Sequence, residues 1–295
     1  MNISVIGAGQ MGAGIAQVFA TKGHQVSLVD LNREALDRGV AAIGSSLDRI
    51  VRKERMTEGE KTAALENIRP FTELGAGVAS ADLVIEAATE NVDLKLKIFA
   101  QLTNLAPAAA PLATNTSSIS ITRIAAATDR PEKVIGMHFM NPVPVMKLVE
   151  VIRGYATDDA TTDLVMDLSR ELGKVPVEVR DYPGFVANRI LMPMLNEAFY
   201  TLWENIGGVK EIDTVMKLGM AHPMGPLQLA DYIGLDTCLA ILRVMHDGFG
   251  RAHYQPCPLL VNMVTAGKLG RKSGEGFYDY SHGGKELVVS SNFSG

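Results

Sequence analysis

Two side chains near the middle of the chain, His138 and Glu150, are of the types that carry out acid–base chemistry together. Residues 134–152 predict two buried strands joined by a short loop, because apolar runs flank a segment whose prolines forbid a helix. His138 falls on the first strand and Glu150 on the second. A neutral imidazole held by a carboxylate can accept a proton and carry the resulting charge. Since a histidine on an apolar strand is more often a core residue, the assignment depends on its surroundings.

A glycine motif at the amino end predicts a dinucleotide site that could serve this pair. Residues 2–7 resemble a buried strand, and a helical pattern begins at residue 13. The GxGxxG sequence lies between them, where its glycines allow a tight turn, close approach to a pyrophosphate and close helix packing. The cofactor-binding candidates are Gly7, Gly9, Gln10, Met11 and Gly12. The motif indicates an α/β fold with a Rossmann-type doubly wound sheet.

The second predicted strand, residues 25–30, ends in Asp30. An acid about 20 residues beyond the glycines can bind a ribose 2′-hydroxyl and repels a 2′-phosphate, so Asp30 favours NAD over NADP. Arg33 lies close enough to argue the other way. A glycine turn followed by an exposed aspartate is the alternative without a cofactor.

The gap between Asp30 and the next predicted strand is too long for one crossover helix, which indicates a helical hairpin inserted at about residues 32–67. Asn32 can cap its first helix, and Thr57 with Glu60 forms a capping-box pattern for its second. The spacing of three polar residues places them on one face of the first helix. These residues, Ser46, Arg49 and Lys53, form either a solvated basic face or a clamp on an anionic group.

Further polar side chains follow the next two predicted strands, residues 81–88 and 111–115. Ligands of such sheets bind beyond the carboxyl ends of the strands, so Glu90 and the segment from Asn115 to Ser118 are candidates. Glu90 could equally be an exposed acid at a helix start, where the macrodipole favours it. The hydroxyls of the segment could equally cap the helix that follows.

Several motifs together resemble the L-3-hydroxyacyl-CoA dehydrogenase family, and the match extends over nearly the whole chain. The motifs are Gly7-x-Gly9-x-x-Gly12, Asp30, the helical hairpin, Thr114-Asn-Thr-Ser-Ser118, Gly136-Met-His-Phe-Met-Asn-Pro142, Asp181-x-Pro-Gly-Phe-Val-Ala-Asn-Arg189 and Gly-Pro-Leu-x-Leu-Ala-Asp231. The middle and late motifs are more specific than the glycine turn.

The resemblance implies a role for each matching residue. His138 would remove the proton of the 3-hydroxyl group, and Glu150 would hold the imidazole. Ser117 and Asn188 would hydrogen-bond the reacting oxygen or the acyl group, while Asn141 would position cofactor and substrate. The remaining roles are a contact with the NAD side for Glu90 and Lys95, and binding of the CoA portion for Ser46 and Lys53. Arg49 is added by helical spacing alone.

The chain divides at Pro183–Gly184 into an expected NAD-binding domain, residues 1–183, and an all-helical domain, residues 184–295, for substrate and dimerisation. Thr157 is expected to cap the helix that precedes the last strand of the sheet. Apolar pairs every four residues from 190 to 206 predict one heavily buried helix stripe. A flexible glycine-rich loop is expected at 267–276 and a tail at 290–295. A homodimer formed by this domain is implied by the resemblance to the family, and not by the periodicity of the helices.

Composition excludes several other classes of protein. The net charge of −5 argues against nucleic-acid binding, and no apolar run reaches the length of about 20 residues that spans a bilayer. The two cysteines lack ligand-like spacing, so neither a disulfide nor a metal site is expected. We therefore expect a cytoplasmic protein without a membrane partner.

The leading hypothesis is an NAD-dependent enzyme that interconverts (S)-3-hydroxyacyl-CoA, such as 3-hydroxybutyryl-CoA, and 3-oxoacyl-CoA. This reaction belongs to fatty acid metabolism and β-oxidation. Two alternatives stay open at this point: a dehydrogenase of a free sugar acid or hydroxy acid, and a noncatalytic dinucleotide-binding protein.

Overall fold

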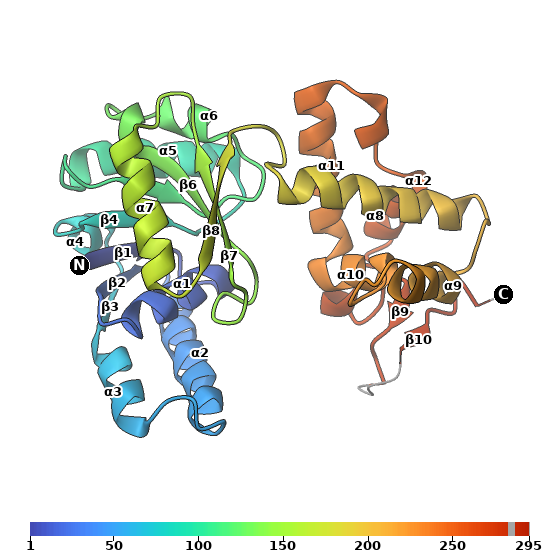
Figure 1. Ribbon diagram of the computed structural model, residues 1–295, viewed down its shortest axis with the longest axis horizontal. Helices are drawn as coiled ribbons and strands as arrows, with labels where there is room; N and C mark the ends of the chain where they lie inside the picture. The colour runs from blue at the N-terminus through green and yellow to red at the C-terminus, as the bar shows by residue number, and fades with distance from the viewer. Residues whose placement is uncertain (283–286, 295) are drawn as a thin grey trace. The chain divides into compact units, whose positions relative to one another are not determined.

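The computed structural model of the protein describes residues 1–282 and 287–294, and the chain forms two compact units, Met1–Tyr182 and Pro183–Gly295 (Figure 1). The first unit contains the sheet, and the second is mostly helical. Each unit has its own cluster of buried apolar side chains.

The first unit is built on an eight-stranded sheet with the order β3-β2-β1-β4-β5-β6-β7-β8. The strands are β1 (Asn2–Ile6), β2 (Gln25–Val29), β3 (Ile68–Phe71), β4 (Leu83–Glu86), β5 (Leu112–Thr114), β6 (Val134–Phe139), β7 (Leu148–Arg153) and β8 (Val175–Arg180). The first six strands in this order are parallel, whereas β7 is antiparallel to β6 and β8 is parallel to β7. This confirms the predicted Rossmann-type sheet.

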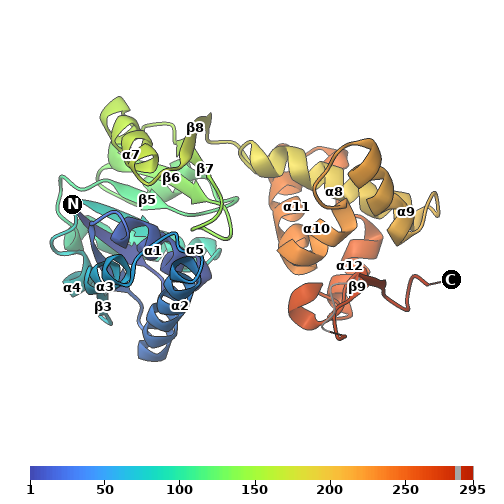
Figure 2. The same ribbon diagram turned by 60° about the horizontal axis from the view of Figure 1, so that its bottom comes forward.

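Helices cover both faces of the sheet, so its central strands are buried on both sides and are almost continuously apolar (Figures 1 and 2). The helices are α1 (Gln10–Ala20), α2 (Arg33–Val51), α3 (Glu58–Glu66), α4 (Leu74–Val78), α5 (Val92–Leu105), α6 (Ile121–Ala125) and α7 (Asp159–Glu171), with a 3₁₀ turn, η1 (Pro131–Lys133). Side chains of α1, α2 and α7 share one core cluster with those of the strands.

The predicted hairpin insertion is present as α2 and α3. The Asn32 side chain accepts a hydrogen bond from the Ala35 amide at 3.1 Å, and both bonds of the Thr57–Glu60 capping box are formed. Lys61 of α3 pairs with Asp48 of α2 at 2.5 Å, which joins the two helices. The two caps predicted for the hairpin are confirmed.

Two expectations for the first unit are wrong. Lys53 does not lie on the first helix, because α2 ends at Val51, and Lys53 occupies the turn that follows. Thr157 does not cap α7, because the Asp158 side chain accepts the bond from the Thr161 amide at 2.7 Å. The Thr157 hydroxyl instead donates to the Val134 carbonyl at 2.6 Å and so ties the loop to β6.

The second unit packs its helices around α8 and adds a two-stranded antiparallel sheet. Its elements are α8 (Ala187–Trp203), α9 (Val209–Thr214), the π-helical η2 (Val215–Gly219), α10 (Pro226–Ile233), α11 (Leu235–Phe249), η3 (Ala252–Tyr254), α12 (Pro258–Thr265), η4 (Arg271–Ser273), β9 (Tyr278–Asp279) and β10 (Val288–Val289). Only part of the predicted stripe is buried. Leu195 and Phe199 are fully buried, whereas Ile190, Trp203 and Ile206 are 67%, 49% and 72% exposed.

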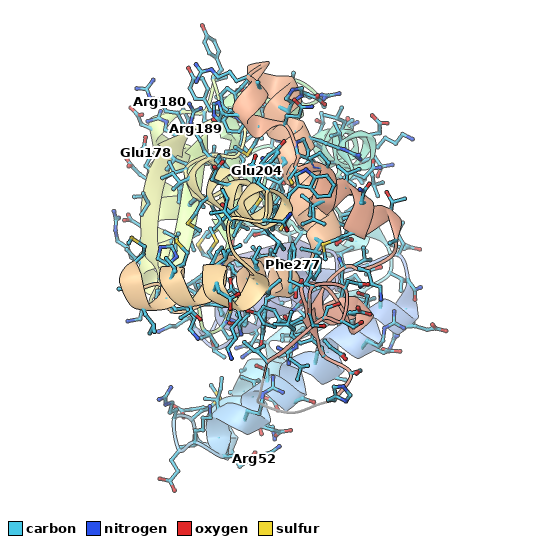
Figure 3. All side chains as sticks on the ribbon, turned by 90° about the vertical axis from the view of Figure 1, so that its right-hand side faces the viewer. Arg52, Glu178, Arg180, Arg189, Glu204 and Phe277 are labelled. Atoms are coloured by element: carbon cyan, nitrogen blue, oxygen red, sulfur yellow. The ribbon has the colours of Figure 1, made fainter. Side chains whose placement is uncertain are left out.

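The carboxyl-terminal segments are packed rather than free. Lys268 forms an ion pair with Glu275 across the glycine-rich loop. Beyond it, Ser290 is fully buried and the Phe293 ring lies 5.7 Å from the ring of Phe277, which Figure 3 labels. The tail predicted at 290–295 is therefore wrong for residues 290–293, and Gly295 lies outside the described residues.

The described residues contain neither a membrane-spanning helix nor a metal-binding cluster. Within residues 1–282 and 287–294, no helix is both long and apolar enough to cross a membrane. In the same described part of the chain, no cluster of three or more His, Cys, Asp and Glu side chains could hold a metal ion.

Candidate active site

The glycine turn between β1 and α1 has the shape that a dinucleotide requires. Gly7 has a φ of +100°, and a Cβ atom on it would lie 2.6 Å from the Ala88 Cα atom, so this position admits only glycine. A Cβ atom on Gly12 would lie 1.8 Å from the Gly7 carbonyl oxygen, which explains the close packing of helix and strand. A Cβ atom on Gly9, in contrast, would meet nothing within 4 Å. Gly9 therefore faces open space at the amino terminus of α1, where a pyrophosphate fits.

The remaining two residues of the motif, Gln10 and Met11, open α1. Gln10 is exposed and Met11 is half-buried, so both have accessible surface next to Gly9.

Asp30 is fixed at the end of β2, beside the glycine turn. Its two carboxylate oxygens accept hydrogen bonds from the amides of Ala8 and Asn32, each at 3.0 Å. Arg33 is paired with Asp37 at 3.0 Å on α2. Because the guanidinium already has a partner and the Asp30 carboxylate is held at the turn, this edge of the sheet favours a ribose hydroxyl over a 2′-phosphate.

His138 and Glu150 face each other directly, because the antiparallel register of β6 and β7 pairs these two residues. His138 Nδ1 lies 2.9 Å from Glu150 Oε2, and His138 Nε2 lies 3.0 Å from Ser117 Oγ. Both members of the pair are buried. An ionised carboxylate only accepts hydrogen bonds, so the imidazole proton belongs on Nδ1. Nε2 then presents its lone pair towards Ser117, as a general base requires.

Glu90 holds the turn that carries Ser117. Its Oε1 atom accepts hydrogen bonds from the Thr116 hydroxyl at 2.7 Å, the Ser117 amide at 2.8 Å, and the amide and hydroxyl of Ser118, both at 3.1 Å. The helix that follows is capped by Ser120, not by the hydroxyls of this segment. Glu90 is exposed and directly precedes Asn91, the N-cap of α5 (Val92–Leu105), and these hydrogen bonds join it to the Ser117 turn at the carboxyl edge of the sheet.

A buried ion pair beneath Glu90 was not foreseen from the sequence. Lys95 Nζ lies 2.6 Å from Glu86 Oε2 and 3.8 Å from Glu90 Oε2, and its side chain is 1% exposed. Glu86 also accepts from the Thr114 hydroxyl and from the amide of Ala88, the residue against Gly7. Lys95 therefore pairs with these two carboxylates from within the unit, and its predicted contact with the NAD side stays a prediction. The signal for Glu86 was a carboxylate ending an apolar strand, which needs a counter-charge when buried.

Asn115 and Asn141, two of the asparagines in the motifs, differ in burial. Asn115 is buried, and its Oδ1 atom accepts a hydrogen bond from the Phe139 amide at 2.8 Å, so it ties the end of β5 to the end of β6. Asn141 is exposed in the loop between β6 and β7, and its peptide bond to Pro142 is cis.

Four of the expected residues lie outside this constellation. Ser46 and Arg49 lie on α2 and Lys53 follows it, near Arg52, which is labelled in Figure 3. Arg49 and Lys53 are exposed and Ser46 is half-buried, so an anion could reach them. Asn188 lies in the first turn of α8, in the second unit, and is 8% exposed. Its proximity to His138 stays a prediction.

The structure thus brings Glu90, Ser117, His138 and Glu150 together at the carboxyl edge of strands β4 to β6, with the glycine turn at the neighbouring strand of the same edge. A hydroxyl group beside Nε2 of the imidazole could lose its proton there while its carbon delivers a hydride to a bound nicotinamide.

Comparisons with known proteins show the family of the chain. Residues 2–182 match the family model described as 3-hydroxyacyl-CoA dehydrogenase, NAD binding domain, and residues 184–280 match that described as 3-hydroxyacyl-CoA dehydrogenase, C-terminal domain. The chain is 55% identical to a 3-hydroxybutyryl-CoA dehydrogenase of Bradyrhizobium diazoefficiens over 94% of both chains. It is 53% identical to a probable 3-hydroxybutyryl-CoA dehydrogenase of Bacillus subtilis, over 94% of this chain and 96% of the relative.

Among solved structures, the (S)-3-hydroxybutyryl-CoA dehydrogenase of Ralstonia eutropha is similar with a TM-score of 0.92 and 51% identity. The match covers 95% of this chain and 99% of that one.

Proposed function

The chain belongs to the 3-hydroxyacyl-CoA dehydrogenase family, and from this premise we propose that it oxidises a short (S)-3-hydroxyacyl-CoA, such as 3-hydroxybutyryl-CoA, to the 3-oxoacyl-CoA and catalyses the reverse reaction. The family and its NAD cofactor were both predicted from the sequence, and the comparisons confirm them. The observation that carries the assignment of residues is the hydrogen-bonded chain from Ser117 through His138 to Glu150.

In the oxidation, His138 accepts the proton of the 3-hydroxyl group at Nε2. Glu150 keeps the imidazole in the required tautomer and stabilises the imidazolium that forms. Ser117, whose amide donates to Glu90 and whose hydroxyl lies 3.0 Å from His138 Nε2, would hydrogen-bond the same oxygen. The glycine turn and Asp30 would hold NAD, which would supply the acceptor for the hydride that leaves C3. No other acid–base group is needed to remove the proton of the hydroxyl group.

The short acyl group is proposed from the relatives, whose names specify 3-hydroxybutyryl-CoA. The basic residues at the end of α2, Arg49 and Lys53, are proposed to bind the phosphates of CoA together with Ser46. A free hydroxy acid would leave these residues without a ligand, so this alternative is not favoured.

The substrate is tested by following NADH absorbance with 3-oxoacyl-CoA thioesters of graded chain length, beside free 3-keto acids and with NADPH in place of NADH. We expect the highest rate with the four-carbon thioester and NADH. Equal or higher rates with a free keto acid would refute the substrate class, and a maximum at long chains would refute the proposed chain length.

The noncatalytic alternative is tested by His138→Gln. This variant should lose about 10²- to 10⁴-fold in turnover, the usual contribution of a general base, while its affinity for NADH stays within twofold. Equal turnover of the variant and the wild type would remove His138 from the mechanism.

We propose further that the protein is a homodimer formed through the second unit. We also propose that it works in the cytoplasm. Exposed apolar side chains at 206, 215, 218 and 220 are 60% to 82% exposed, and an apolar groove of about 480 Å³ lies beside Ile206 and Val215. Sedimentation should give a dimer, and Ile206→Asp should give a monomer. A wild-type monomer at micromolar concentration would refute the dimer, and recovery of the native protein in the membrane or secreted fraction would refute the location.

A further inference from the structure

Lys174 is a buried cation whose ammonium group binds only backbone oxygens among the described residues. It is 9% exposed, and its Nζ atom donates to the carbonyl of Val143 at 2.5 Å and to that of Met146 at 2.7 Å. Burial lowers the pKa of the Lys174 ammonium, and within residues 1–282 and 287–294 no acidic side chain offsets this effect. A lysine that packed only for its apolar stem would extend its charged end into water.

The backbone on both sides of Lys174 is fixed, so the ammonium is delivered to one place. The turn after α7 is closed by hydrogen bonds from the Gly173 amide to the Arg170 carbonyl and from the Lys174 amide to the Ser169 carbonyl, at 2.9 and 3.0 Å. Gly173 has the positive φ of +75° that this helix end needs. Strand β8 begins at the next residue, whose amide donates to the Lys147 carbonyl at 2.8 Å.

The segment that Lys174 holds, residues 140–147, is the loop between β6 and β7. It connects the strand of His138 to the strand of Glu150 and carries Asn141. The amides of Val145 and Met146 both donate to the Pro142 carbonyl at 3.0 Å, which shapes the loop but does not attach it to the rest of the unit.

The loop also rests on helix α1 through the side chain of Val143. Val143 is 2% exposed, and a Cβ atom on Gly14 would lie 2.9 Å from the Val143 Cβ atom. Gly14 follows Gly12 of the glycine turn by two residues. Val143 thus contacts the Lys174 ammonium through its carbonyl, and through its side chain it contacts the helix that begins at the dinucleotide site.

We propose that Lys174 is a positioning residue, whose ammonium holds the loop 140–147 against α1 and so sets the distance between the His138–Glu150 pair and the cofactor site. The proposal rests on the proposed function only for its kinetic consequence. A displacement of about 1 Å at a reacting group can cost about 10²-fold in rate, so a loosened loop should reduce turnover without any change in the acid–base pair.

The main test compares Lys174→Met, which keeps the length of the stem but has no donor, with Lys147→Met, which removes an exposed lysine from the same loop. Hydrogen exchange measured on peptides should show at least tenfold faster exchange of residues 140–147 in Lys174→Met, with the protection of β6, β7 and α7 unchanged. Its kcat/KM should fall about 10- to 100-fold. Lys147→Met should stay within twofold of the wild type in both measurements, and Lys174→Arg, which can also donate to two carbonyls, should recover part of the loss.

Three outcomes would overturn the proposal: unchanged exchange of the loop in Lys174→Met, faster exchange spread equally over the whole unit, or a freed loop with turnover within twofold of the wild type. If Lys174→Met does not fold, Gly14→Ala presses on the Val143 side chain instead. Unchanged loop exchange and turnover in that variant would also refute the proposal. A wild type that does not turn over the thioester would refute the proposed function, whereas the exchange measurement would still decide whether Lys174 holds the loop.

Discussion

Replacement of Glu150 by glutamine probes the carboxylate that holds the catalytic imidazole. The substitution keeps the shape of the side chain but removes its charge. His138 Nδ1 lies 2.9 Å from Glu150 Oε2 and both side chains are buried, so water cannot replace the lost charge readily. The amide of glutamine could also donate to Nδ1, which would move the imidazole proton to Nε2 and leave no lone pair there for the substrate.

The size of the loss follows from the charge that develops during the reaction. Two opposite unit charges about 4 Å apart attract each other by about 4 kcal/mol at an effective dielectric constant of about 20. This attraction exists only once the imidazole is protonated, so it lowers the barrier rather than the energy of the bound substrate. Since about 1.4 kcal/mol is tenfold in rate, we expect kcat to fall about 10³-fold. The reversed tautomer would increase the loss further.

The assay is NAD reduction by (S)-3-hydroxybutyryl-CoA, with the affinity for NADH measured separately. Glu178→Gln is the matched control, because it makes the same substitution on the neighbouring strand β8, where the Glu178 side chain is 48% exposed and pairs with Arg153. The control should keep kcat within twofold. A double variant that lacks both His138 and Glu150 should be no slower than His138→Gln alone, because the two side chains act as one unit. A folded Glu150→Gln variant with kcat within threefold of the wild type would refute the reasoning.

Three further predictions test other parts of the molecule. Lys53→Glu should raise KM for the CoA thioester at least tenfold, whereas Lys22→Glu, at another exposed lysine, should leave KM unchanged. An unchanged KM in Lys53→Glu would contradict the proposed binding of CoA by Lys53. Gly9→Ala and Gly44→Ala should both fold, since an added Cβ atom meets nothing within 4 Å at either site. Only Gly9→Ala should weaken NADH binding in a titration, and equal affinities of the two variants would disprove the close approach of a phosphate to Gly9. Asp231→Asn should lower the free energy of unfolding by about 1–3 kcal/mol in denaturant titration. The Asp231 carboxylate accepts hydrogen bonds from two buried main-chain amides, and the NH₂ group of asparagine could not accept one of them. Unchanged stability would argue against this network.

Some features of this protein were determined by short stretches of sequence. The glycine turn, the Asn32 cap and the Thr57–Glu60 capping box were predicted and are present, because each is formed by residues at most a few positions apart. Such interactions depend on the local backbone and on side chains within its reach, so the residue types specify them. The alternation of apolar strands with helices likewise predicted the class of sheet.

Errors occurred where local signals compete or where packing decides. Thr157 and Asp158 are both good capping residues, and Asp158 caps the helix. The Thr157 hydroxyl instead donates to the carbonyl of Val134, more than 20 positions away. The helical period from 190 to 206 indicated which residues are apolar, but not that Ile206 would stay exposed on the second unit. Periodicity describes one helix, whereas burial depends on what covers it.

The site itself was decided by the tertiary structure. A spacing of 12 residues between His138 and Glu150 is compatible with several loop lengths, and only the register of β6 and β7 places the two side chains opposite each other. The bonds from Glu90 to the Ser117 turn span 26 to 28 residues, and that from Lys174 to Val143 spans 31. The sequence supplied the chemical groups, but their distances arise when the ends of separate strands meet at one edge of a sheet, and this requires the fold to be complete.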